Sequence, residues 1–323
     1  MSKYKFIDLF SGAGGFSLGF YLTGKFQPIL AIDNFKPAAE TYKVNFPEVL
    51  VLVEDIRDLR EDDLLKIAKP GEIDLVIGSP PCEPFTGANP SRQRNPLDRL
   101  YTDQQGQLVL HFIRIVGYYK PRVFIMENVP AIAESQLREA LVYEFKRIGY
   151  KHVYFNLLNA EHYGTPSRRR RVFISNIPIK PPRVEKPVTV SEALSDLPPP
   201  TTIIPNHDPP PELPYRKLRR VACKRWGEAL IYFHGAKKLI PNLIRLNPSD
   251  LAPTVMGSSR FIHPFENRLL TVREQARLMG FPDTFIFTGG RDSQYNMIGE
   301  AVPVPLARAI ALYTYRVLES GDV

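Results

Sequence analysis

Short runs of β-branched and aromatic residues alternate with helix-length segments over the first half of the chain. The runs expected to form strands are Tyr4–Phe10, Pro28–Ile32, Val49–Val53, Ile73–Ile77, Arg122–Met126, Val153–Leu158 and Arg171–Ser175. Between them, apolar residues recur at helical spacing in Ala38–Phe46, Leu64–Ala68, Gln107–Tyr118 and Gln136–Ile148. This alternation predicts an α/β fold built on a parallel sheet.

The alternation stops in a proline-rich segment. Twelve of the 31 prolines lie from Pro178 to Pro214, where neither a regular helix nor a central strand is expected. Helical spacing returns in Thr271–Met279 and again in Pro303–Leu318. We therefore predict three successive parts, namely an α/β domain begun by residues 1–178, an irregular insert at 179–265, and completion of the first domain by 266–323.

Composition narrows the class of protein. The 323 residues include 42 Lys and Arg against 34 Asp and Glu, a formal charge of +8, and 44% are hydrophobic. A folded basic protein is indicated, and the charge slightly favours a polyanionic partner. No apolar run approaches the ~18 residues of a membrane span, so we expect a cytoplasmic protein without a membrane partner. The two cysteines, Cys82 and Cys223, have unrelated surroundings, and neither a disulfide framework nor a metal site is expected.

A glycine-rich turn follows the first expected strand. In DLFSGAGGFSLGF (8–20), Gly12, Gly14 and Gly15 let the backbone turn tightly and approach a ligand, while the next helix offers free N–H groups. Asp33 follows the second strand and Asp55 the third, at the edge where an open sheet binds its ligand. Either aspartate alone is explained by a helix cap. Together with the turn they favour a nucleotide-like cofactor.

Candidate catalytic groups follow the next strands. Cys82 lies in GSPPCEPF, where prolines on both sides fix a stiff turn after the fourth strand. A thiol in such a turn is a candidate nucleophile, provided that neighbouring groups favour its thiolate. Glu127 ends the fifth strand and is a candidate acid or base. In SRRRRVF, Arg169 and Arg171 share one face of a strand, with the other two arginines on the opposite face.

Two further segments are candidates for nucleic-acid contact. The polar segment GANPSRQRNPLDR (87–99) is either a solvent loop or a lid whose arginines touch phosphates. RKLRRVACKR (216–225) holds six Lys or Arg in ten positions and is either a solvated face or a contact with the DNA backbone. Trp226, the only tryptophan, is expected to anchor the core of the insert. The candidate DNA-binding residues are Arg92, Arg94, Arg99, Arg216, Lys217, Arg219 and Arg220.

Six motifs occur in a specific order along nearly the whole chain. They are DLFSGAGGF, the Pro-Cys after the fourth strand, ENV after the fifth, YGTPSRRRRVF, RLLTVREQARLMGFPD and GEAVPVPLA. In this order the chain resembles the DNA cytosine carbon-5 methyltransferase family. The resemblance implies a Rossmann-like class I methyltransferase sheet with a small, irregular target-recognition domain inserted at 179–265, the interval outside the motifs.

The resemblance also implies roles for individual residues. Cys82 matches the nucleophile that attacks cytosine carbon 6, Glu127 the carboxyl group that holds the ring, and Arg169 with Arg171 the arginines that orient them. The implied cofactor is S-adenosylmethionine, with S-adenosylhomocysteine as product. The matching cofactor-binding residues are Phe10, Ser11, Gly12, Gly14, Gly15, Asp33, Asn34, Asp55, Ile56, Pro80, Leu108, Glu300, Ala301 and Val302. A cytosine in a duplex is out of reach of such groups, so the base has to leave the stack.

The chain departs from the family pattern at three positions. Glu83 follows the cysteine where Gln is usual, Ser167 precedes the arginine pair where Gln is usual, and Glu300 replaces Asn. A carboxylate at Glu83 is expected to raise the pKa of the adjacent thiol unless a cation offsets it. None of the three changes removes a group that makes or breaks a bond.

Two other functions remain open at this stage. PPCEPFTG resembles the loop of the tRNA cytosine-5 methyltransferases, but the Cys-Phe-Thr typical of their recognition region is missing. A catalytically silent nucleic-acid-binding relative is the third interpretation, against which the retained Cys82 and Glu127 argue. The preferred reading is a sequence-specific enzyme of the restriction-modification or solitary type, acting on double-stranded DNA. We expect a monomer, with a cognate restriction endonuclease as a possible partner.

Overall fold

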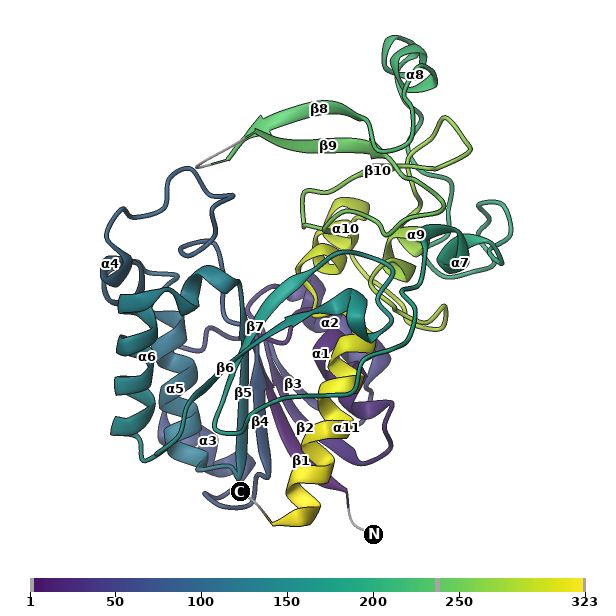
Figure 1. Ribbon diagram of the computed structural model, residues 1–323. Helices are drawn as coiled ribbons and strands as arrows, with labels where there is room; N and C mark the ends of the chain where they lie inside the picture. Colours follow the sequence, from purple (N-terminus) through teal and green to yellow (C-terminus); the bar gives the residue numbers. More distant parts are fainter. Residues whose placement is uncertain (1–2, 236–238, 322–323) are drawn as a thin grey trace.

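The structure is a computed structural model that describes residues 3–235 and 239–321. Its centre is a seven-stranded sheet in the order β3-β2-β1-β4-β5-β7-β6 (Figure 1). The strands are β1 (Tyr4–Leu9), β2 (Phe26–Ile32), β3 (Leu50–Leu52), β4 (Leu75–Gly78), β5 (Val123–Asn128), β6 (Tyr154–Asn159) and β7 (Arg170–Ser175). Every strand predicted from the sequence is present, with ends shifted by one or two residues.

Strand β7 runs against the rest of the sheet. Strands β1 to β5 pair in parallel, whereas β7 is antiparallel to both β5 and β6. The expectation of a wholly parallel sheet is therefore wrong at this edge. The physical reason is the connection, because only the short 3₁₀ helix η2 (Ala160–Tyr163) and a few more residues join β6 to β7, and a parallel return needs a crossover of about a dozen residues or more.

Helices cover both faces of the sheet (Figure 1). Apolar residues of α3 (Glu61–Ile67), α5 (Leu108–Tyr119) and α6 (Ser135–Arg147) pack against one face. The other face is covered by α1 (Gly15–Tyr21), α2 (Lys36–Asn45) and α11 (Val304–Ser320). Burial of these apolar faces is the main favourable term in the stability of such a layered domain.

The C-terminal helix completes the N-terminal part of the fold. Gly19 in α1 faces Ala307 in α11, and a Cβ atom on Gly19 would lie only 2.3 Å from the Cβ of Ala307. A glycine is thus required for the two helices to touch. The C-terminal helix therefore packs on the first helix of the chain.

A smaller three-stranded sheet lies beyond the carboxyl ends of the central strands (Figure 1). Its order is β10-β9-β8, with β8 (Ala229–His234) antiparallel and β10 (Phe261–Ile262) parallel to β9 (Leu239–Arg245). A small apolar cluster stabilises it, and a larger cluster joins it to α1, α2 and the C-terminal helices. The remaining helices are α4 (Pro96–Tyr101), η1 (Pro130–Ala133), α7 (Val190–Leu194), α8 (Tyr215–Ala222), α9 (Val272–Arg277) and α10 (Arg291–Glu300).

Two expectations for the insert are corrected. The proline-rich segment contains a one-turn helix, α7, because ten proline-free residues follow Pro187 and Thr189 forms a capping box with Glu192. Trp226 does not anchor a core. Its side chain is 52% exposed, its Nε1 donates to the carbonyl oxygen of Pro264, and its ring meets that of Phe265 edge to face.

No helix within residues 3–235 and 239–321 is long and apolar enough to cross a membrane.

Candidate active site

The loop after β4 holds Cys82 beside the end of β5. The carbonyl oxygen of Cys82 accepts hydrogen bonds from the amides of Phe85 and Thr86, which closes a tight turn. Asn128, the last residue of β5, donates from Nδ2 to the carbonyl oxygen of Pro80 at 3.0 Å. These contacts fix the cysteine-bearing turn against the neighbouring strand, where the sequence had placed the candidate acid.

Glu127 forms an ion pair with Arg171 next to this turn. Their Oε1 and Nε atoms are 3.0 Å apart, and both side chains are largely buried. The two residues come from β5 and β7, which pair in antiparallel register with Glu127 opposite Phe173. The antiparallel pairing of the two strands therefore brings one of the alternating arginines to the carboxylate of Glu127.

Arg169 has a different environment from Arg171. Its Nη1 donates to the carbonyl oxygens of Val255 at 2.6 Å and Gly299 at 2.9 Å, and its Nη2 to that of Glu300 at 3.3 Å. Its side chain is 3% exposed, and burial followed by the charge of Arg171 lowers its pKa to about 9. Arg169 thus ties the insert and the C-terminal segment to the site rather than bonding to Glu127.

The surroundings of the Cys82 thiol disfavour its thiolate form. Burial is the main cause that raises its pKa, to about 12, and the carboxylates of Glu83 and Glu127 raise it further. Arg171 and Arg169 act in the opposite direction. The contribution expected of Glu83 is confirmed. A thiol with its pKa raised in this way has to lose its proton before it can act as a nucleophile.

Asp33 and the glycine-rich turn form one hydrogen-bonded unit. One carboxylate oxygen of Asp33 accepts from the amide of Gly12 and the other from the amide of Phe35, both at 2.8 Å. Gly14 has φ of +91°, a conformation that L side chains rarely adopt. Phe10 also lies in the left-handed region, with φ of +58°, which is strained for an aromatic residue and typical of functional sites.

A cavity of about 350 Å³ opens beside this unit. Six predicted cofactor residues line it, namely Phe10, Asp33, Asn34, Asp55, Ile56 and Leu108. Sequence reasoning missed six other lining residues, Ile32, Glu54, Arg57, Pro81, Gln104 and Gln105. Arg57 and Glu54 adjoin the predicted aspartate in sequence, which is a usable signal, whereas nothing in the sequence marks Gln104 or Gln105.

The other predicted cofactor residues lie around rather than in this cavity. Pro81 lines it in place of Pro80, whose carbonyl oxygen is bonded to Asn128. A Cβ atom on Gly15 would lie 2.8 Å from the carbonyl oxygen of Val302 and 3.0 Å from Ala301 Cβ, so the glycine turn and the C-terminal motif touch. The Ser11 hydroxyl is buried without a hydrogen-bond partner among the described residues.

Glu300 lies near the carboxylates of Glu83 and Asp33. Desolvation raises the pKa of its carboxyl group to about 7, and the charges of Glu83 and Asp33 add to this effect. Ser167, the second departure from the family pattern, is fully buried and donates to the carbonyl oxygen of Leu278 at 2.8 Å. Its place beside the arginine pair is thus fixed by the segment that follows the insert.

The comparison with protein families decides the assignment. The model of the family described as C-5 cytosine-specific DNA methylase matches residues 4–315. The chain belongs to this family. It is a DNA cytosine-5 methyltransferase, and the large parallel-rich sheet is the Rossmann-like sheet of that class.

The sequences of related proteins align with this chain over most of their lengths. M.MJ0563P of Methanocaldococcus jannaschii is 52% identical over 94% of this chain and 97% of its own. Type II methyltransferase M.DdeI of Desulfomicrobium norvegicum is 35% identical over 94% of this chain and 87% of its own. The crystal structure of a prophage-encoded E. coli protein covers 98% of this chain and all of that one, at 26% identity and a TM-score of 0.78.

The three arginines of the polar segment 87–99 have different surroundings in the methyltransferase. Arg94 is exposed, and Arg92 is half-buried with Nη1 bonded to the carbonyl oxygen of Phe85. Arg99 is 6% exposed and donates to the carbonyl oxygens of Gln93 and Arg94. Arg99 therefore braces this segment from inside the fold, and its burial argues against the contact with DNA that was expected of it.

The basic segment of the insert forms helix α8 at the far end of the small sheet (Figure 1). Its side chains are exposed apart from that of Val221, which packs into the small apolar cluster. Arg220 donates to the carbonyl oxygen of Leu230 at 3.2 Å, and the Arg219 guanidinium lies 6.0 Å from the centre of the Tyr215 ring. The helix thus presents a row of positively charged side chains on a face that does not pack against the core.

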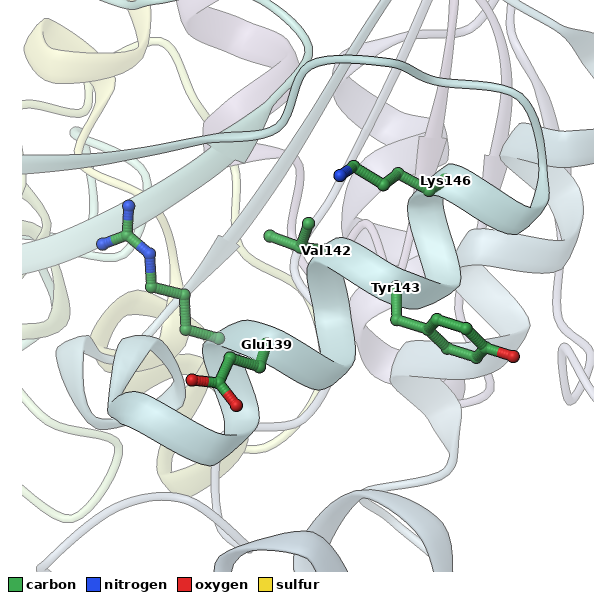
Figure 2. Close-up of a pocket in the computed structure, with 5 residues that line it drawn as sticks. Glu139, Val142, Tyr143 and Lys146 are labelled. Carbon is green, nitrogen blue, oxygen red and sulfur yellow. The ribbon is translucent and has the colours of Figure 1, made fainter.

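A second hollow of about 430 Å³ lies on the outer face of α6. Arg138, Glu139, Val142, Tyr143 and Lys146 line it. Figure 2 shows the side chains of Glu139, Val142, Tyr143 and Lys146 projecting from this helix. None of these residues belongs to the predicted site of the methyltransferase.

Proposed function

We propose that this methyltransferase uses Cys82 as a covalent nucleophile on a cytosine flipped out of double-stranded DNA, with S-adenosylmethionine as methyl donor. The observation that carries the proposal is the meeting of three groups at one sheet edge. The Cys82 turn, the Glu127–Arg171 ion pair and the cavity lined by Phe10 all lie where β1, β4 and β5 end.

The cavity fits the proposed cofactor. Asp33, held by two backbone amides, has the chemistry to accept hydrogen bonds from ribose hydroxyls. Asp55 offers carboxylate oxygens and the buried Ile56 an amide that donates to no acceptor among the described residues, a pair that complements the amine and ring nitrogen of adenine. S-adenosylmethionine, when bound, supplies an electrophilic methyl group and leaves as S-adenosylhomocysteine.

The chain's own residues then activate the base. Carbon 5 of cytosine is not nucleophilic until a group adds at carbon 6, so we assign the Cys82 sulfur to form that bond as its proton leaves. Glu127, oriented by Arg171, holds the ring nitrogen and amine and shares a proton with the ring as the enamine forms. After transfer, loss of the carbon 5 proton breaks the sulfur–carbon bond and restores the aromatic ring.

We assign target recognition to residues 179–265. The small sheet and α8 lie beyond the catalytic edge, as a DNA-facing unit requires (Figure 1). Candidate phosphate contacts are Arg92, Arg94, Arg216, Lys217, Arg219 and Arg220. The relatives named above favour a type II enzyme. We propose that it acts as a monomer and has a cognate restriction endonuclease.

The proposal is tested by incubating the protein with methyl-labelled S-adenosylmethionine and either duplex DNA or tRNA. We expect label in the 5-methylcytosine of DNA, with none in tRNA. Label in tRNA alone would identify the tRNA branch of this fold, and the absence of label from both would identify a silent relative.

A further inference from the structure

The turn that carries Asp55 is fixed from two sides. Helix α5 braces its backbone, since Arg114 donates from Nη1 to the carbonyl oxygen of Leu59 and from Nη2 to that of Ile56, both at 2.9 Å. The amide of Asp58 also bonds to the carbonyl oxygen of Asp55 at 3.0 Å. The backbone of the turn therefore has little freedom left, and the rotamer of the Asp55 side chain is the remaining variable.

Arg57 fixes the rotamer of the Asp55 side chain. Its Nε lies 2.9 Å from Asp55 Oδ1 and its Nη2 lies 2.6 Å from Oδ2, the side-on fork that arginine forms with carboxylates. The Arg57 amide adds a third bond to Oδ1 at 2.9 Å. Arg57 is also the main cause that lowers the pKa of Asp55, which keeps the carboxyl group ionised.

The contacts with Arg57 leave few acceptor positions free on the Asp55 carboxylate. A carboxylate has about four lone-pair positions, and the three bonds from Arg57 occupy two on Oδ1 and one on Oδ2. One position of Oδ2 stays available. Both Asp55 and Arg57 line the cavity, and the Asp55 side chain is 22% exposed there.

We propose that Arg57 is a positioning residue that selects the purine of the cofactor by presenting this single acceptor of Asp55 next to the amide of Ile56. An acceptor beside a donor matches adenine, which has an amine at carbon 6 and a bare nitrogen at position 1. It opposes hypoxanthine, which has an oxygen at carbon 6 and a hydrogen at position 1. The inference rests on the proposed cofactor and deepens it.

A competing role for Arg57 predicts the opposite change in cofactor affinity when the residue is removed. If its guanidinium instead filled the place of adenine, removing it would free the site and tighten binding. A merely structural role would weaken all ligands equally. The two roles and the proposal are separable by measuring two ligands that differ only at the purine edge.

The test is calorimetric binding of S-adenosylhomocysteine and S-inosylhomocysteine to the full chain and its variants. We expect the wild type to prefer the adenine compound, and Arg57→Ala to bind it roughly tenfold more weakly, the loss typical of one well-made hydrogen bond, with little change for the inosine compound. Arg57→Lys keeps the charge without the fork and is expected to recover only part of the preference. Arg60→Ala removes an equal charge three residues away and is the matched control.

Each other outcome overturns the inference. Tighter binding by Arg57→Ala would show that the guanidinium blocks the site, and equal losses for both ligands would show a structural role. An unchanged preference would remove Arg57 from recognition while leaving the proposed function intact. Failure of the wild type to bind S-adenosylhomocysteine would remove the proposed cofactor itself, and the inference with it.

Discussion

Arg171 Nε lies 3.0 Å from Glu127 Oε1, while the guanidinium of Arg169, two residues earlier, bonds only to backbone carbonyl oxygens among the described residues. The guanidinium groups of Arg169 and Arg171 thus bind different partners, one a set of backbone carbonyl oxygens and the other a carboxylate. Arg171 orients a side chain at the candidate reaction centre, and Arg169 holds two chain segments against it. Their substitution is expected to give different defects.

We expect Arg171→Lys to lower the rate of methyl transfer by about tenfold to a hundredfold with a nearly unchanged melting temperature, because a lysine retains the charge but not the Nε contact with Glu127. Arg169→Lys leaves buried carbonyl oxygens without partners and is expected to lower the melting temperature by several degrees, for a loss of about 1–3 kcal/mol. Single-turnover rates and thermal unfolding of both variants measure this contrast. Equal loss of stability in both would contradict the division of roles.

Cys82→Ser is expected to abolish methylation and to leave binding of S-adenosylhomocysteine nearly intact, since the residues proposed to hold adenosine lie on other strand ends. Wild-type enzyme should form a covalent adduct with duplex DNA that carries 5-fluorocytosine at the target, because fluorine blocks the final elimination. Denaturing gel electrophoresis detects the adduct. Substantial methylation by the serine variant would rule out the covalent mechanism.

The reactivity of the thiol gives a pH test of the charges around it. Because its pKa is raised to about 12, the thiolate fraction near pH 8 is small and grows tenfold per pH unit until the pKa is reached. Removing the Glu83 charge lowers that pKa, so Glu83→Gln should be alkylated faster at a fixed pH, by roughly threefold for half a pKa unit. Alkylation by iodoacetamide is followed in a Cys223→Ser background, which leaves Cys82 as the single thiol.

A rate that is flat with pH across pH 7–10 would contradict the raised pKa of Cys82. An effect of Glu83→Gln in the opposite direction would show that another group controls the thiol. Lys69→Gln, at the opposite edge of the sheet, is the control for a general change in net charge.

Helix α8 is expected to contact DNA phosphates. Replacing Arg216 and Lys217 by Gln should weaken binding to every duplex and reduce the log–log salt slope by about 0.9 per lost contact, with turnover at saturating DNA little changed. The matched control replaces Lys69 and Lys151, exposed lysines before the N-terminal ends of β4 and β6.

Affinities for cognate and random duplexes at several salt concentrations decide the question. A loss confined to the cognate site, of about 1–3 kcal/mol per base pair, would mean that the helix reads bases. Unchanged affinity and slope would show that α8 is a solvated face with no part in binding.

The sequence alone determined the central sheet and most of the candidate chemistry. Alternating apolar runs located all seven strands, because strand and helix periods differ and each leaves its own spacing of buried residues. The residues Asp33, Asp55 and Cys82 were found because each follows a strand, and parallel strands bring their carboxyl ends to one edge. That rule is local enough to be read from one chain. Phe10 was found only through the resemblance to the family.

Tertiary structure decided what depends on contacts between distant segments. The antiparallel course of β7 followed from the length of one connection, and the burial of Arg99 and the exposure of Trp226 followed from how loops fold back. No local pattern distinguishes Arg169, held by carbonyl oxygens some 86 and 130 residues away, from Arg171. Arg57 and Asp55 are close in sequence, but their ion pair becomes relevant to cofactor binding only because both residues line the cavity. The direction of a hydrogen bond is set by three-dimensional packing and not by spacing along the chain.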